Sequence, residues 1–252
     1  MLDPYINPLL ATFLISLRIA PTFAFAPPFT LLRIPPLIRV LAALSVAAWM
    51  VAANPGATSE RVVTGPDIVL LFAGELFLGI ALMLSLQLAF AALLMAGRTI
   101  DVQAGFGLAL LIDPTSQAQT PLIGTVFAYA AAAVFFASGG PQELLAVWFA
   151  SLESFPIGSS GLSPQIGPLL SYVSTVFFIA MGLAGLALLT LFLIDLTVAF
   201  MSRTLPQMNV LLLGFQVKTL ALLAVLPVTI AVSGTVFLRL VRVAIDAAPA
   251  FV

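Results

Sequence analysis

Long apolar segments, separated by short stretches rich in proline, glycine or polar residues, make up most of the chain. A helix needs about 20 apolar residues to cross the hydrocarbon core of a bilayer. The pattern therefore predicts an all-α, polytopic membrane protein of long, partly broken helices and helical hairpins. About six hydrophobic segments are predicted, over residues 7–26, 37–53, 68–96, 121–138, 168–200 and 210–238.

Proline and glycine mark the ends of these segments. The pairs Pro27-Pro28 and Pro35-Pro36 end the first segment and open the second, because a proline nitrogen has no hydrogen to donate inside a helix. The stretch 29–40 contains the second pair together with Arg33 and Arg39, which predicts a rigid basic elbow. The third segment is longer than the hydrocarbon core is thick, so it must tilt, bend or protrude, and Gly74 and Gly79 are candidate sites of bending or close helix approach.

Two features divide the second half of the chain. Residues 142–155 mix aromatic and acidic side chains, which predicts a short helix at an interface or between other subunits. The Gly/Ser/Pro-rich run 158–168 that follows predicts a boundary between residues 1–160 and 161–252. Small residues at helix-packing spacing predict close contacts between helices, at Ala128/Ala132, Ala180/Ala184 and Gly182/Gly185.

Composition excludes several function classes. Hydrophobic residues make up 62% of the chain and charged residues 8%, against about 25% charged in soluble domains. The net charge of -1 provides no basic surface for nucleic acid. Without cysteine or histidine, disulfides, thiolate metal sites and the commonest general base are excluded, and nothing places a serine beside the single lysine. We therefore identify no catalytic or metal-binding residues and no cofactor motif, and we do not expect an intramembrane hydrolase.

The stretch 96–124 is a conspicuous polar and glycine-bearing interruption of the apolar pattern, and it contains Arg98, Asp101 and Gln103. Its Gly105-Phe106-Gly107 triplet lacks the preceding strand and the following lysine of a phosphate-binding loop. The glycines instead indicate irregular backbone, which at membrane depth must be buried in protein or line a cavity. Asp113-Pro114 is typical of a helix N-cap followed by proline at the first helical position.

Charged residues inside apolar segments are functional candidates. Glu75, Asp195 and Lys218 lie within such segments, and Arg203 follows close behind. A proton or ion relay through Glu75 and Asp195 is one interpretation. The favoured interpretation is structural: Asp195 and Lys218 lie near the ends of the last two helices and pair across the hairpin, with each other or with Arg203.

Four segments, in order and spread over nearly the whole chain, resemble the FliR/SctT family of inner-membrane subunits of the type III secretion export apparatus. They are RIAPTFAFAPPF with the following IPPLIRVLAALSVA, then GELFLGIALML, AGRTIDVQAGFGLALLIDPTSQAQTPLIG and LPQMNVLLLGFQVK. The resemblance implies a flagellar export-gate subunit, assembled with P-type and Q-type subunits and other export-apparatus membrane proteins at the flagellar basal body. Unfolded export substrates would pass through this channel. Residues 1–160 would resemble a P-type subunit and 161–252 a Q-type hairpin.

The resemblance also implies roles for two loops. A pore plug over about residues 105–119 would include Gly105, Phe106, Gly107, Leu108, Leu110, Leu111, Ile112, Asp113 and Pro114. Its apolar side chains would close a narrow pore, because a hydrophobic constriction loses its water readily. A hairpin turn at the cytoplasmic mouth would comprise Leu205, Pro206, Gln207, Met208 and Asn209.

Three other functions remain open at this point. The chain could be the homologous subunit of a virulence injectisome. It could be a small-solute secondary transporter, although the internal repeat typical of that class is not visible. It could also be a scaffold that holds other subunits without lining the pore.

Overall fold

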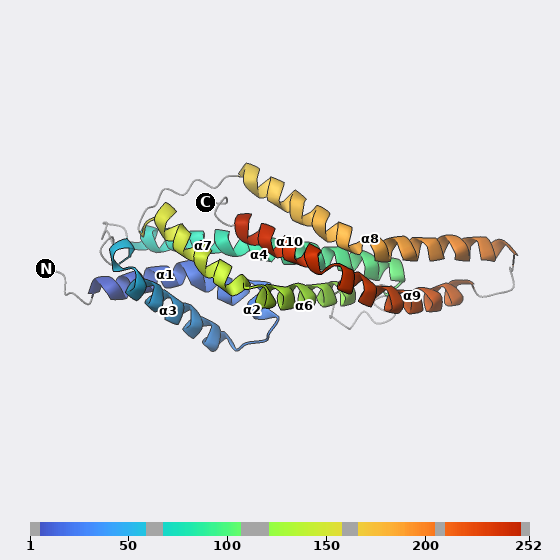
Figure 1. The fold of residues 1–252 in the computed structure, drawn as a ribbon, viewed down its shortest axis with the longest axis horizontal. Helices are drawn as coiled ribbons and strands as arrows, with labels where there is room; N and C mark the ends of the chain where they lie inside the picture. Colours follow the sequence, from blue (N-terminus) through green and yellow to red (C-terminus); the bar gives the residue numbers. More distant parts are fainter. Residues whose placement is uncertain (1–5, 59–67, 107–120, 158–165, 205–209, 248–252) are drawn as a thin grey trace. The chain divides into compact units, whose positions relative to one another are not determined.

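The computed structural model describes residues 6–58, 68–106, 121–157, 166–204 and 210–247, and all the regular structure within these ranges is helical (Figure 1). The helices, in chain order, are α1 (Ile6–Phe25), α2 (Pro27–Thr30), α3 (Pro36–Ala53), the short 3-10 helix η1 (Pro55–Ala57), α4 (Ile68–Ala104), α6 (Leu122–Ala137), α7 (Gly140–Ser154), α8 (Ile166–Thr204), α9 (Val210–Val232) and α10 (Gly234–Ala247).

Five of these helices are long and apolar enough to cross a membrane: Ile6–Phe25, Pro36–Ala53, Val69–Ala104, Gly167–Thr204 and Leu212–Val232. A sixth span is formed if α6 and α7, which are bent by 73° at their junction, are taken as one broken span. This confirms the predicted all-α membrane fold with about six hydrophobic segments. It also confirms the short helix predicted over residues 142–155, which the structure places at Gly140–Ser154.

Helix α4 differs from the prediction because it continues eight residues past the expected end at Ala96 and stops at Ala104. The polar residues that suggested an interruption sit on a regular helix. Ala96, Ile100 and Ala104 recur every four residues and are fully buried, so one face of this extension packs against protein. Polarity alone therefore does not end a helix whose polar side chains find partners.

The last predicted segment, 210–238, is also two helices and not one. Helix α9 ends at Val232, and the carbonyl of Ser233 accepts hydrogen bonds from Val236 N and Phe237 N, which begins α10. Gly234 at this junction is a weak helix former. Helix α10 then runs to Ala247, nine residues past the predicted end at Leu238. It has one buried apolar face, made of Phe237, Leu240, Val241, Ala244 and Ile245. Its charged side chains are exposed: Arg239, Arg242 and Asp246.

The proline elbow after α1 is held by the second arginine of the predicted basic stretch. Arg39 donates from Nε to Ile34 O at 2.9 Å and from Nη1 to Ala24 O at 2.8 Å, so its side chain ties the elbow back to the end of α1. Pro36 occupies the first position of α3, where its missing N–H costs nothing. Arg33 adopts a positive φ of 51° in the turn.

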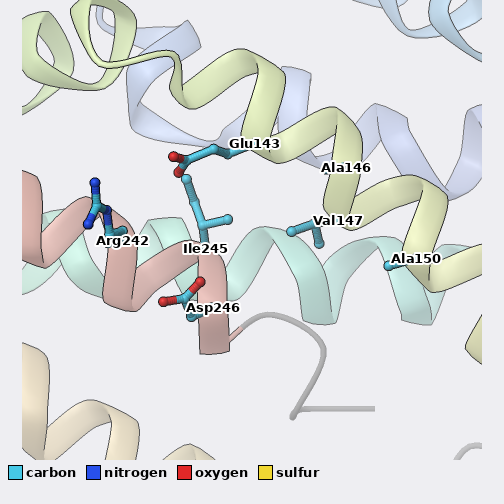
Figure 2. A pocket seen from close by; sticks show the side chains of 7 residues that line it. All are labelled: Glu143, Ala146, Val147, Ala150, Arg242, Ile245 and Asp246. Atoms are coloured by element: carbon cyan, nitrogen blue, oxygen red, sulfur yellow. The ribbon is translucent and has the colours of Figure 1, made fainter.

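The chain forms two compact units. The first comprises Met1–Leu88, Phe135–Val173 and Val241–Val252, and in it α1 packs against α3. Aromatic rings fill part of its core: Phe23 contacts both Phe29 and Trp148, with centroid distances of 4.8 and 5.7 Å. In the same unit, α7 and the C-terminal part of α10 together line a hollow (Figure 2).

The second unit comprises Ala89–Val134 and Ser174–Leu240. In it α8 and α9 pair as the predicted hairpin, and a Cβ on Gly214 of α9 would lie 3.4 Å from Val198 of α8. The small-residue pairs Ala128/Ala132 and Ala180/Ala184 are buried. Gly182 and Gly185 differ from the prediction, because no described atom lies within 4 Å of a Cβ placed on either.

Several predicted features lie outside the described residues: the linker over 158–165 and the hairpin turn Leu205, Pro206, Gln207, Met208 and Asn209. The division of the chain into residues 1–160 and 161–252 stays a prediction.

Candidate functional site

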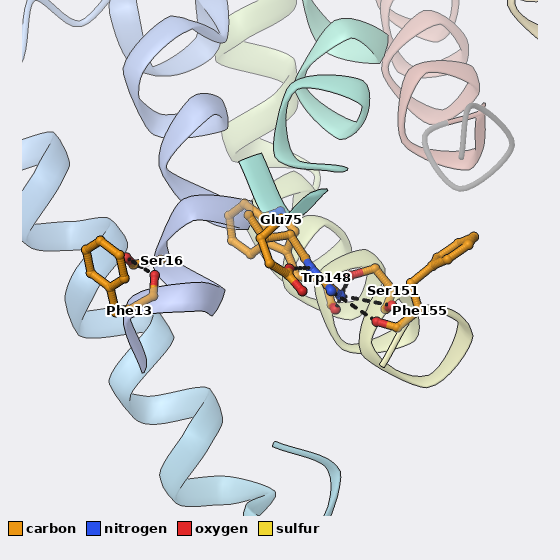
Figure 3. Close-up of polar contacts among 7 residues, drawn as sticks. Phe13, Ser16, Glu75, Trp148, Ser151 and Phe155 are labelled. Atoms are coloured by element: carbon orange, nitrogen blue, oxygen red, sulfur yellow. Dashed lines mark hydrogen bonds and ion pairs between the residues drawn. The ribbon is translucent and has the colours of Figure 1, made fainter. Parts of the chain in front are cut away.

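Arg18 of α1 and Glu75 of α4 form a buried ion pair in the first unit (Figure 3). The distance from Arg18 Nε to Glu75 Oε2 is 2.7 Å, and the two side chains are only 1% and 3% exposed. The remaining guanidinium nitrogens reach the C-terminal end of α7: Nη1 donates to Ser151 O at 3.0 Å and Nη2 to Phe155 O at 3.0 Å. One guanidinium group therefore joins α1, α4 and the C-terminal end of α7.

Gly79 explains how α4 comes close enough to α1 for this pairing. A Cβ at Gly79 would lie 2.5 Å from Arg18 O and 2.7 Å from Leu17 O, so only glycine fits where the two backbones touch. Glu75 lies one helical turn earlier, on the same face of α4. The contact confirms the predicted close approach at Gly79 and places the carboxylate beside the guanidinium.

In the second unit, contacts converge on the two ends of the loop 107–120, whose own residues lie outside the described ranges. We call this group of contacts the loop base. It comprises Gly97, Asp101, Gln103, Phe106, Ile123, Gly124, Asp195, Phe215 and Lys218.

The first part of the loop base joins the helix before the loop to the helix after it. Asp101 of α4 accepts a hydrogen bond at Oδ1 from Ile123 N, at 3.3 Å, in the first turn of α6. The carboxylate satisfies a first-turn N–H that has no partner within α6. Its negative charge is also stabilised by the positive N-terminal end of the α6 dipole. Four residues before Asp101, a Cβ on Gly97 would lie 2.0 Å from Gly124 N, so the two backbones are in direct contact.

The second part ties the end of α4 to the hairpin. Lys218 Nζ of α9 lies 2.5 Å from Asp195 Oδ1 of α8. The other carboxylate oxygen of Asp195 accepts from Gln103 Nε2 at 2.8 Å, and Lys218 Nζ also donates to Gln103 O at 3.1 Å. Gln103, Asp195 and Lys218 therefore form a closed triangle between α4, α8 and α9.

The two residues just before the loop continue these contacts. Gly105 has a φ of 89°, a left-handed conformation that glycine adopts without strain and that turns the chain away from α4. The ring of Phe106 then packs edge-to-face on Phe215 of α9, with a centroid distance of 6.4 Å. The loop thus leaves α4 at a fixed position on the hairpin.

The sequence profile of the family described as bacterial export proteins, family 1, matches residues 9–244. The chain belongs to this family. The flagellar biosynthetic protein FliR of Bacillus subtilis is 30% identical over 216 residues, which cover 82% of this chain and 81% of the relative. FliR of Escherichia coli is 26% identical over 203 residues, 71% and 77% of the two chains. The Yop proteins translocation protein T of Yersinia pestis is 30% identical over 155 residues, 60% and 59%.

These matches confirm the resemblance to the FliR/SctT family. The family and the apolar helices make the chain a multi-pass inner-membrane subunit of a type III secretion export apparatus, with the flagellar assignment carried by the FliR relatives. Such a subunit assembles with other components of the apparatus.

In this export subunit, the predicted site residues fall into two groups. Gly105, Phe106, Glu75, Asp195, Arg203 and Lys218 are described, whereas Gly107, Leu108, Leu110, Leu111, Ile112, Asp113 and Pro114 lie outside the described ranges. Of the two pairings considered for Asp195, the structure forms the one with Lys218, and Arg203 is exposed in the last turn of α8. Within the described residues no group of three or more potential ligands is placed to hold a metal ion.

Sequence reasoning missed two contributors. Arg18 was visible as a lone charge in the first apolar segment, and a buried arginine needs a carboxylate, so Glu75 was the available signal for the pair. Gln103 gave no such signal, because its partners come from α8 and α9, more than 90 residues further along the chain.

Proposed function

We propose that this subunit forms part of the wall of a flagellar protein-export channel and that residues 105–119 act as its plug. The observation that carries the proposal is the loop base: Asp101 and Gly97 hold the two helices that flank the loop against each other, and the Gln103 triangle holds them on the hairpin. A loop anchored in this way at both ends can fill one place in a channel and return to it after displacement.

The composition of the loop suits a seal. Leu108, Leu110, Leu111 and Ile112 present apolar side chains, which exclude water from a narrow constriction without any charge to attract ions. The proposed action is steric, with no catalysis and no cofactor, so the energy for export comes from other components of the apparatus.

The proposed partners are P-type and Q-type export-gate subunits in a hetero-oligomer, with unfolded flagellar proteins as the cargo. Supporting this, large apolar side chains are exposed along α8 and α9, including Phe178, Phe192, Phe200, Leu220, Leu223 and Val232. Assembly with apolar partners or with lipid would remove these side chains from water. Copurification of the tagged chain in a mild detergent tests the partners, and recovery of injectisome subunits in their place would contradict the flagellar assignment.

Deleting residues 107–112 tests the plug. In the assembled complex, the deletion should make the membrane permeable to small ions, measured as the loss of a potassium gradient from cells or vesicles. Deleting six residues of the linker, 159–164, is the matched control and should leave the gradient intact. Unchanged permeability in the first deletion, with assembly preserved, would rule out the plug.

A scaffold role is distinguished by crosslinking. A photoreactive residue at Phe106 should capture a stalled export substrate if this segment lines the channel. Capture of neighbouring subunits alone would favour the scaffold. The transporter alternative has no observation in its favour, because Glu75 and Asp195 each already have a cation partner within the chain.

A further inference from the structure

Helices α7 and α10 line an open hollow of about 390 Å³ that the export role does not use (Figure 2). Glu143, Ala146, Val147 and Ala150 come from α7, and Arg242, Ile245 and Asp246 from α10. All seven residues belong to the first unit. The volume falls within the range of about 300–1,000 Å³ that is usual for small-molecule sites.

The hollow combines two kinds of lining. Its centre is apolar, with Ile245 buried and Val147 half-buried. Charged groups of both signs stand around it, one guanidinium on Arg242 and two carboxylates on Glu143 and Asp246. In the part of the chain that the structure describes, none of these three side chains forms an ion pair or a side-chain hydrogen bond. Their charges are therefore available to a ligand.

Neither helix is long enough to cross a membrane by itself. At about 1.5 Å per residue, α7 with 15 residues and α10 with 14 are too short to cross a hydrocarbon core of roughly 30 Å. Helix α10 has a continuous apolar face and an exposed face that carries arginine and aspartate, the pattern of a helix that lies at the level of the lipid head groups.

We propose that this hollow binds the head group of a phospholipid that carries a primary ammonium, such as phosphatidylethanolamine. Arg242 would bind the phosphate, because a guanidinium matches phosphate oxygens with two parallel donors. Glu143 and Asp246 would accept hydrogen bonds from the ammonium group. Val147 and Ile245 would contact the apolar glycerol and acyl carbons, and the hollow is open on one side, which would leave room for the acyl chains to extend out of it.

The charges around the hollow favour one type of lipid head group over others. An anionic head group such as phosphatidylglycerol satisfies Arg242 but brings a negative charge to two carboxylates with no cation between them. The trimethylammonium of phosphatidylcholine carries positive charge but has no N–H to donate. Of these three head groups, only that of phosphatidylethanolamine offers the two carboxylates both a positive charge and N–H donors. The site should therefore rank phosphatidylethanolamine above phosphatidylcholine and phosphatidylcholine above phosphatidylglycerol.

Native mass spectrometry of the full chain in a mild detergent, with the three lipids added in equal amounts, tests this ranking. We expect phosphatidylethanolamine to be retained on the order of tenfold more than phosphatidylglycerol, the effect of one charge-assisted contact. Equal retention of the three lipids would overturn the proposal.

Matched variants locate the binding. Arg242→Gln and Glu143→Gln should each reduce retention of phosphatidylethanolamine by about tenfold. Arg239→Gln removes the same charge from α10, and Glu153→Gln the same charge from α7, at exposed positions that do not line the hollow. These two controls should bind as the unaltered chain does, and an equal loss in a control would refute the site. Because all four positions are exposed, unfolding is not expected, and the melting temperature of each variant checks this.

A protein occupant is the remaining outcome. A photoreactive residue at Ala146 in the assembled apparatus should form an adduct with the mass of a phospholipid. An adduct with another subunit would mean that a neighbouring helix fills the hollow, and would overturn the lipid site without affecting the proposed export role.

Discussion

Arg18 Nε and Glu75 Oε2, 57 positions apart in the sequence, lie 2.7 Å from each other in a site that excludes nearly all solvent. Lys218 and Asp195 also pair, but their side chains are 17% and 38% exposed. The two ion pairs therefore differ in kind. Breaking the first leaves a buried charge without a partner, whereas water can solvate the second.

Removing one partner of the buried pair should be strongly destabilising. We expect Glu75→Ala or Arg18→Ala alone to lower the free energy of unfolding by about 3–5 kcal/mol. The double variant Arg18→Met with Glu75→Leu should recover most of the loss, because neither charge is then left buried. Thermal unfolding of the full chain in detergent measures both. A double variant as unstable as the single ones would show that Arg18 acts mainly through Ser151 and Phe155.

Lys218→Met should lower the free energy of unfolding far less than loss of either partner of the buried pair. A partly exposed pair contributes about 0.2–1 kcal/mol, and Asp195 keeps its hydrogen bond from Gln103. A double-mutant cycle with Asp195→Asn measures the coupling, and Arg203→Gln is the control for removing an exposed charge from the hairpin. Coupling as large as that of the buried pair would contradict the exposure-based ranking.

Gly97→Ala should destabilise the loop base. The added methyl group would overlap the backbone of Gly124, and forcing the helices apart costs about 1–3 kcal/mol or more. Gly182→Ala is the matched control, since open space surrounds that position, and it should be neutral or stabilising by up to about 1 kcal/mol. The difference in melting temperature between the two variants checks this. Equal melting temperatures would mean that α4 and α6 can move apart freely.

Asp101→Ala should release the start of α6. Losing a capping carboxylate costs about 0.5–2 kcal/mol. Asp101→Asn keeps an acceptor oxygen and should lose less, and Val102→Ala is a control at an exposed neighbouring position. Faster hydrogen exchange at the first turn of α6 is the direct readout. Exchange that is unchanged in Asp101→Ala would remove Asp101 from the loop base.

Sequence patterns predict most of the helices because each apolar run has to cross the membrane and ends at proline or glycine. Their helix ends are wrong where side chains from other helices bind polar residues and allow a helix to continue. Asp101 and Gln103 look like loop residues until Ile123 and Asp195 supply their hydrogen bonds, which lets α4 continue to Ala104.

The ion pairs of the candidate site also divide into one that the sequence predicts and one that depends on tertiary contacts. The pairing of Asp195 with Lys218 could be predicted, since both lie at matching heights on a hairpin that the sequence defines. The sequence shows Arg18 and Glu75 as lone charges in two apolar segments, but it does not show that these two segments are neighbours, which depends on α4 touching α1 at Gly79. That contact is a property of two helix surfaces and not of either segment alone.

The Arg18 cluster also sets an order of events during synthesis. Glu75 follows Arg18 by 57 residues, and Ser151 and Phe155 follow it by 133 and 137. At about 5–20 residues per second, the ribosome completes the last of these partners on the order of ten seconds after it makes Arg18. Glu75 can neutralise the charge of Arg18 well before that, but until then the two Nη groups lack the carbonyl acceptors of Ser151 and Phe155. Helix α1 can therefore complete its contacts only after the end of α7 has been made.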